Sequence, residues 1–305
     1  LGLTESRFRS LLDAGLRTVS VSLDGFEREH NYIRCNPRSY ERALGALRMI
    51  VREPSLAYDV VTCVSGAMVP RLGEFCEMLV AEGVKHWRLF SIFPMGRAKD
   101  DPTLRMTDEQ FRTMLEFIRQ TRREGRIDVS YACEGFLGGY ETEVRDHFYQ
   151  CAAGVSVASI RVDGAISGCT SIRANFNQGN IYRDKFWDVW QNRFEPFRNR
   201  EWARCGECAS CKMFRYCLGG GMHLHGDDGG CSIATITGFD AYPFLKKGPP
   251  SVGGCFFSRL SLSLSALTSA VPISVVPIST AHPRMPFPCR LFLGARQFFP
   301  CRLRS

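Results

Sequence analysis

A dense run of cysteines between residues 205 and 231 constrains this chain more than any other feature. The segment CGECASCKMFRYCLGGGMHLHGDDGGC holds five of the 14 cysteines in the sequence. Thiolates at this density on glycine-rich loops are typical of a soft metal centre and not of a hydrophobic core. The glycines at 219–221 would let the backbone bend closely around such a centre.

Iron–sulfur ligation, zinc ligation and disulfide bonding are the alternatives for this segment. Cys208, Cys211 and Cys217 follow the spacing C-x2-C-x5-C, without the second C-x2-C or the H-x3–5-H of an ordinary zinc site. His223 and His225 are only two residues apart. Disulfide frameworks are typical of small secreted domains, and nothing marks this chain as one. We therefore favour an iron–sulfur centre, with zinc as the alternative.

Length and charge set further limits. A chain of 305 residues can hold one large domain or two ordinary ones. Residues 232–305 hold eight of the 39 Lys and Arg residues but one of the 31 acidic residues, so residues 1–231 are nearly neutral. This balance predicts no nucleic-acid surface. Fourteen cysteines indicate a reducing compartment, and the start LGLTESRF contains no signal segment, which favours a cytoplasmic location.

Strand and helix patterns alternate through the first 132 residues. The expected strands are 18–23, 57–64, 86–93 and 127–132, and the expected helices start near Thr4, Ser39, Pro70 and Thr107. This alternation predicts parallel β/α units, although four strands are too few for a closed eight-stranded barrel. Reactive sites of such folds lie at the carboxyl ends of the strands. Asp24, Ser65 and the loop FPMGRAK (93–99) would lie there.

The sequence changes character at Cys151. SVASIRVDGAISGC alternates apolar and polar residues around Asp163-Gly164, which predicts a small hairpin. An aromatic-rich helix is expected at 186–197. These elements form too small a core to be stable alone, so a metal centre would be needed to hold them together.

Residues 232–305 form an atypical tail that is rich in Ser, Pro and Arg and lacks helix or strand periodicity. Its serines and prolines make residues 260–280 a poor membrane span. A disordered basic tail and a frame-shifted stretch are the other interpretations, and we favour the frame shift. In that case Cys231 would carry no information.

Taken together, residues 1–231 resemble a radical S-adenosylmethionine (SAM) enzyme with a C-terminal SPASM domain, a module that carries auxiliary iron–sulfur clusters. The resemblance lies in Cys151-x12-Gly164-x4-Cys169, then NQGNI, then CASCKMFRYCLGGG. SVSLDG (20–25) is similar to the family's fourth barrel strand, and FRYC…GMHLH is similar to a subgroup paired with bacterial lipoproteins. The implied fold is a partial (β/α) TIM-like barrel at 1–132, a linker at 133–150 and a small α+β SPASM domain at 151–231.

The resemblance also implies site residues. In this family the fourth-strand Ser and an Arg twelve residues later contact SAM, and Ser22 and Arg34 match that spacing with Asp24 beside them. Gly221 stands where a cysteine usually helps to bind the first auxiliary cluster, and no catalytic residue is assigned. The implied metal ligands are Cys151, Cys169, Cys205, Cys208, Cys211, Cys217 and Cys231.

One departure from the family pattern concerns its chemistry. The sequence contains no C-x3-C-x2-C, the motif that holds the SAM-cleaving [4Fe–4S] cluster in this family. We therefore expect an inactive, N-terminally truncated fragment of an enzyme whose 5′-deoxyadenosyl radical abstracts hydrogen from a peptide or protein.

The resemblance implies cofactors and partners as well. Expected cofactors are auxiliary [4Fe–4S] clusters and, in the parent enzyme, SAM. Expected partners are the peptide or protein substrate and an electron-donor protein, with no nucleic acid and no membrane. The alternative function is a non-catalytic iron–sulfur or zinc module that binds a peptide or transfers electrons.

Overall fold

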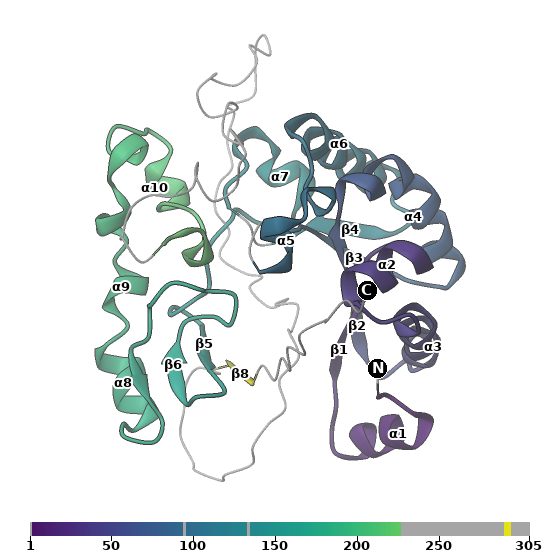
Figure 1. Cartoon of the computed structure of the whole chain (residues 1–305), viewed down its shortest axis with the longest axis horizontal. Coiled ribbons are helices and arrows are strands. Elements are labelled where there is room, and N and C mark those ends of the chain that lie inside the picture. The colour runs from purple at the N-terminus through teal and green to yellow at the C-terminus, as the bar shows by residue number, and fades with distance from the viewer. Residues whose placement is uncertain (1, 94–95, 133–134, 227–289, 294–305) are drawn as a thin grey trace, which may run out of the picture.

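The computed structural model describes residues 2–93, 96–132, 135–226 and 290–293. Figure 1 shows a parallel sheet with its helices and, beside it, a smaller α+β region that runs from β5 to α10. The first region contains α1 (Glu5–Asp13), β1 (Thr18–Ser22), α2 (Glu27–Arg34), α3 (Ser39–Val51), β2 (Ala57–Val64), α4 (Leu72–Ala81), β3 (His86–Ser91), α5 (Arg97–Asp100), α6 (Asp108–Glu124), β4 (Asp128–Tyr131) and α7 (Glu141–Val144).

The sheet of the first region confirms the predicted β/α alternation. Its strands lie in the order β1-β2-β3-β4, and every neighbouring pair is parallel. One face carries Val21, Val60, Trp87 and Val129, which are buried under the helices. Burial of such apolar side chains stabilises the sheet by about 1.5–3 kcal/mol for each large residue.

The other face of the sheet carries a polar group that joins three strands. Ser20 on β1 donates to Asp59 on β2 at 2.6 Å, and Arg88 on β3 forms an ion pair with the same carboxylate. This face therefore differs from the continuous apolar surface of an ordinary buried parallel sheet.

Helix ends follow the expected capping chemistry. The Thr4 side chain accepts a hydrogen bond from the backbone of Arg7 at the start of α1. Thr107 and Gln110 form the predicted capping box of α6, and Gly125 ends that helix in the left-handed region. These contacts satisfy backbone groups that a helix end leaves without partners.

Two helices differ from the sequence-based expectation. Helix α2 was missed because His30 is its buried residue, so the segment lacks an apolar stripe. The helix expected to begin near Pro70 begins at Leu72 instead, because Gly66–Arg71 forms a 3-10 helix that includes the proline. Proline fits this short turn because it requires no backbone N–H.

The second region contains β5 (Val157–Ile160), β6 (Ala165–Ser167), β7 (Gly179–Asn180), α8 (Phe186–Asn192), α9 (Glu195–Arg198), α10 (Phe214–Cys217) and β8 (Arg290–Leu293). Strands β5 and β6 form the predicted hairpin. The single aromatic helix expected at 186–197 is in fact two helices, α8 and α9. Trp190 of α8, Phe197 of α9 and Phe194 between the two helices pack into the same small core.

Most of the predicted tail lies outside the described residues. Within it, β8 pairs in parallel with β5, so this short part of the tail has strand structure where none was expected. Among the described residues, no helix is long and apolar enough to cross a membrane. The interpretation of residues 232–305 as frame-shifted stays a prediction.

Candidate active site and iron–sulfur region

The first candidate site is a buried ion pair just past the carboxyl end of β1. Asp24 is fully buried, and its Oδ2 accepts a hydrogen bond from Arg34 Nε at 2.5 Å. Its Oδ1 accepts from the backbone N–H of Cys63 on β2 at 3.0 Å. Burial lowers the pKa of Arg34, but the charge and hydrogen bond of Asp24 outweigh it and raise that pKa above its usual value. The guanidinium is therefore a fixed cation at the edge of the sheet.

His30 supports this pair from α2. Its Nδ1 accepts from the Asp24 backbone N–H at 2.9 Å, so the proton of the neutral ring lies on Nε2, which faces Ser39 Oγ at 3.0 Å. Burial lowers the pKa of His30, which keeps the ring neutral. Sequence reasoning missed His30, because a lone histidine between polar residues gives no signal of burial.

The other residues predicted for this edge are placed as follows. Ser22 is exposed at the end of β1, and the side chain of Ser65 is buried after β2. The structure brings Asp24 and Arg34 together, but no contact of Ser22 with either is recorded in the described part of the chain. Within the loop 93–99, Arg97 donates to the carbonyl of Ile33 at 2.7 Å, which ties the loop to α2.

Six of the seven predicted cysteine ligands lie among the described residues, and Cys231 lies outside them. None of the six forms a disulfide bond, and all are partly exposed: Cys151, Cys169, Cys205, Cys208, Cys211 and Cys217. Consecutive tight turns carry the last four, with hydrogen bonds from the Cys208 N–H to the Cys205 carbonyl at 2.9 Å and from the Cys211 N–H to the Cys208 carbonyl at 3.3 Å. Among residues 2–226 that are described, no three side chains of metal-ligand type are gathered closely enough to hold an ion.

Backbone N–H groups lie near two of these sulfur atoms. Burial raises the pKa of Cys217, and the nearby backbone N–H groups of Gly219 and Gly220 partly offset that rise. The Ser171 N–H donates to Cys169 Sγ at 3.5 Å. Such donors stabilise thiolates and tune iron–sulfur clusters, so the donor chemistry fits a cluster.

Arg200 joins the two ends of the cysteine region. Its buried guanidinium donates through Nη2 to the Gly220 carbonyl at 3.2 Å and lies close enough to Cys151 for the two side chains to interact electrostatically. Burial lowers the pKa of Arg200, and the nearby Cys151 partly opposes this shift. Nothing in the sequence marked Arg200, because a single arginine in an irregular segment has no periodic pattern.

The segment after α10 contacts the carboxyl end of β3. The ring of His223 meets the ring of Phe93 edge to face, with centroids 5.3 Å apart. Burial, followed by the charge of His225, lowers the pKa of His223 to about 4, so its imidazole is neutral at pH 7. The neighbouring His225 is bound differently, through Nε2 to the Gly219 carbonyl at 3.0 Å.

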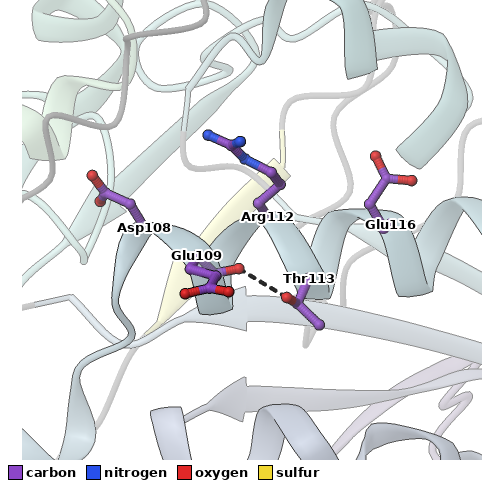
Figure 2. Close-up of a pocket in the computed structure, with 5 residues that line it drawn as sticks. All are labelled: Asp108, Glu109, Arg112, Thr113 and Glu116. Carbon is purple, nitrogen blue, oxygen red and sulfur yellow. Dashed lines mark hydrogen bonds between the residues drawn. The ribbon is translucent and has the colours of Figure 1, made fainter.

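A hollow on α6 lies away from these residues. Figure 2 shows Asp108, Glu109, Arg112, Thr113 and Glu116 lining it, all from this one helix. Thr113 Oγ1 donates to the Glu109 carbonyl at 2.9 Å. A binding cavity normally has walls from several elements, so this hollow is an ordinary solvated helix face.

Four further cysteines lie outside the predicted ligand set, and a place in the core is the sequence-based expectation for Cys35, Cys63, Cys76 and Cys133. Cys76 is buried as expected, and Cys63 is partly buried on β2. Cys35 is exposed at the carboxyl end of α2 in the left-handed region, so the expectation for it was wrong. Cys133, which was also expected in the core, lies outside the described residues.

Residues 151–212 match the SPASM family, an iron–sulfur cluster-binding domain. The chain is also 30% identical over 247 residues to the mycofactocin maturase MftC of Mycolicibacterium smegmatis, covering 75% of this chain and 59% of that protein. The chain carries a SPASM domain and is similar to radical SAM enzymes. A third similarity, to the AdoMet-dependent heme synthase of Oleidesulfovibrio alaskensis, is 21% identity over 225 residues, covering 68% of this chain and 57% of that protein.

Solved structures agree with this radical SAM/SPASM fold. Native anSMEcpe with bound AdoMet and the Cp18Cys peptide matches with a TM-score of 0.51 and 15% identity, covering 73% of this chain and 65% of that one. A histidine-tagged form of anSMEcpe with bound AdoMet matches with a TM-score of 0.50, 15% identity and coverage of 80% and 68%. These similarities confirm the predicted fold class of the radical SAM/SPASM chain.

The chain spans 57% and 59% of the lengths of the two curated relatives. The cofactors of the radical SAM/SPASM family, [4Fe–4S] clusters and SAM, are those that the sequence predicted. Which residues hold each cofactor stays a prediction.

Proposed function

We propose that this chain supplies the SAM-binding strand edge and the auxiliary-cluster domain of a radical SAM enzyme that modifies a peptide or protein. The name of MftC, a maturase, and the peptide bound to anSMEcpe support this substrate class. When bound beside a reduced cluster, SAM supplies a 5′-deoxyadenosyl radical that removes a hydrogen atom from the substrate.

The observation that carries the proposal is the Asp24–Arg34 pair. The Nε–H of Arg34 donates a hydrogen bond to Asp24. Within the described part of the chain, the two terminal nitrogens of Arg34 donate no hydrogen bond. The side chain of Arg34 is 35% exposed while Asp24 is fully buried. Those two nitrogens are therefore available to bind a carboxylate such as that of SAM in bidentate geometry. Ser22, exposed on the adjacent strand end, would add a hydroxyl contact.

The cluster ligands form the second part of the proposal. Cys151, Cys169 and Cys205 would hold the first auxiliary cluster, and Cys208, Cys211 and Cys217 the second, with Cys231 as its fourth ligand. The Ser171 N–H that donates to the Cys169 sulfur, and the backbone N–H groups that lower the pKa of Cys217 against the effect of burial, support this assignment. These groups would orient the thiolates and stabilise their negative charge.

Activity, electron supply and location complete the proposal. Because residues 1–305 contain no C-x3-C-x2-C, we propose that these residues by themselves do not cleave SAM. A separate electron-donor protein would supply reducing equivalents. The nine cysteines of the described residues form no disulfide bond, which supports a reducing, cytoplasmic location.

Anaerobic reconstitution of the 305-residue chain with iron and sulfide tests the cluster assignment. We expect about four or eight irons per chain, with the absorption of cysteine-bound clusters. A chain that takes up no iron and holds one zinc instead would overturn the proposal in favour of a zinc-binding module.

Calorimetric titration with SAM tests the role of Arg34. Arg34→Lys keeps the charge but loses the fork of N–H donors, so we expect at least about tenfold weaker SAM binding. Arg38→Lys, an exposed arginine four residues away, is the matched control. Equal SAM affinity in both variants and the wild type would remove Arg34 from the site.

A further inference from the structure

A short segment between β3 and α6, residues 96–104, lies against α2. It contains the four-residue helix α5 and one turn of 3-10 helix, and its buried side chains are Ala98 and Leu104. A segment with so small an apolar anchor is among the parts of a fold that open most easily. We call residues 96–104 the strap.

Arg97 makes the first contact between the strap and α2. Its Nη2 donates to the carbonyl of Ile33 at 2.7 Å, and its Nη1 donates to the sulfur of Cys35. Ile33 and Cys35 stand on either side of Arg34 in the chain. The strap therefore lies beside the residue that we propose binds the carboxylate of SAM.

The second contact is a hydrogen bond from the hydroxyl of Tyr32 to Asp101 Oδ2 at 2.6 Å. Oδ1 of the same carboxylate accepts from the backbone N–H and the hydroxyl of Thr103, at 3.0 and 2.6 Å, which fixes its orientation. The hydrogen bond to Asp101 raises the pKa of Tyr32, so the phenol keeps its proton and stays a donor. Tyr32 is 57% exposed, so water competes for this bond and the bond can break without exposing a core residue.

The strap is braced internally and begins at a glycine. The guanidinium of Arg105 donates to the carbonyls of Ala98 and Lys99, which ties the two ends of the strap together. Gly96 has φ of 60° and ψ of −132°, a conformation that residues with a side chain rarely adopt. Among the described residues, no atom outside its chain neighbours lies within 4 Å of the place where a Cβ would stand. A glycine in open space beside a braced segment is suited to act as a hinge.

We propose that the strap is a gate beside Arg34: the Tyr32–Asp101 hydrogen bond holds it closed, and it turns about Gly96 to admit and release SAM. This inference rests on the proposed function for its ligand, since it requires that SAM binds at Arg34. The Tyr32–Asp101 bond joins the strap to α2 and not to the ligand. Breaking it should therefore raise the rates of SAM binding and release and leave the affinity unchanged, unlike the loss of affinity expected for Arg34→Lys.

Hydrogen exchange of the 305-residue chain without ligand tests the closing contact. Tyr32→Phe removes one hydroxyl from an exposed side chain, so it should leave the fold intact and raise the exchange rates of residues 96–104 about fivefold. Tyr182→Phe is the matched control, because Tyr182 is 77% exposed and its hydroxyl donates no hydrogen bond in the described part of the chain. Unchanged exchange of the strap in Tyr32→Phe would overturn the inference.

Surface plasmon resonance with SAM as the analyte tests the gate. In Tyr32→Phe we expect the association and dissociation rate constants to rise together, each about fivefold, with an unchanged Kd. Gly96→Ala should act in the same direction, because alanine disfavours the closed backbone conformation, whereas Gly139→Ala, where φ is not positive and a Cβ has open space, should not.

The two measurements separate the possible failures. Faster exchange of the strap with unchanged SAM rates would overturn the gate, because the strap would then open without controlling access to Arg34. A wild-type chain that binds no SAM would instead contradict the proposed function, and the exchange comparison, which needs no ligand, would still decide whether Tyr32 holds the strap closed.

Discussion

The ring of Phe93, just after β3, packs edge to face against the ring of His223 with 5.3 Å between their centroids. This contact joins the parallel sheet to the segment that follows the cysteine loops. It brings residues 222–225 to the carboxyl edge of the sheet, where Asp24 and Arg34 also lie, and this is the edge at which α/β folds bind their ligands.

Phe93→Ala should loosen that connection. Loss of one edge-to-face aromatic contact is expected to cost about 1 kcal/mol. Hydrogen exchange of residues 222–225 should become faster, whereas exchange in β2 should be unchanged. Phe148→Ala, at a residue that is 59% exposed, serves as the control. Unchanged exchange at 222–225 would show that the aromatic contact does not hold the segment in place.

Asp24→Asn should destabilise the carboxyl end of β1. The change removes the negative charge beside Arg34 and weakens the hydrogen bonds to Arg34 and Cys63. Because Arg34 is partly exposed, water offsets some of the loss, and we expect about 2 kcal/mol in the free energy of unfolding. Urea denaturation measures this loss, with the exposed Asp100→Asn as control. Equal stability of the two variants would show that the Asp24–Arg34 pair does not contribute to the free energy of unfolding.

Stability should fall as the pH drops below the unfolded pKa of histidine, because of His30. Burial lowers the pKa of His30 from its ordinary value of 6.5, so below that pH the unfolded chain binds more protons than the folded one. The contribution of His30 is fully present above 6.5 and is lost as the pH falls toward the folded pKa. Urea denaturation at about pH 7.5 and about pH 5.5 should show a smaller decrease for His30→Gln than for the wild type. An equal decrease would assign the pH dependence to other groups.

Gly219→Ala should destabilise the loop after α10 more than Gly206→Ala does. Both glycines have positive φ, +79° and +51°, so alanine strains the backbone at both by about 1 kcal/mol. Only at 219 would the new Cβ lie 2.8 Å from Ala203 Cβ, which adds about 1–3 kcal/mol of overpacking. Thermal unfolding of the two variants measures the difference, and a larger loss at 206 would contradict the described packing.

The sequence could predict elements whose signals are local. The apolar run 57–64 matches β2 residue for residue, and the capping box at Thr107 marks the start of α6. Arg200 could not be predicted, because its importance arises from contacts with Cys151 and Gly220, which are distant in the chain. The contact of the His223 ring with Gly221 could not be predicted either, because it depends on how the loop folds back.

The polar group of Ser20, Asp59 and Arg88 has a consequence for how the chain behaves during folding. A bare sheet face made of apolar residues would associate readily with other exposed apolar surfaces before folding is complete. A carboxylate and a guanidinium in the middle of this face would lose water on such association, which disfavours it. The sheet therefore carries its own protection against aggregation, located in the strands themselves and independent of any covering element.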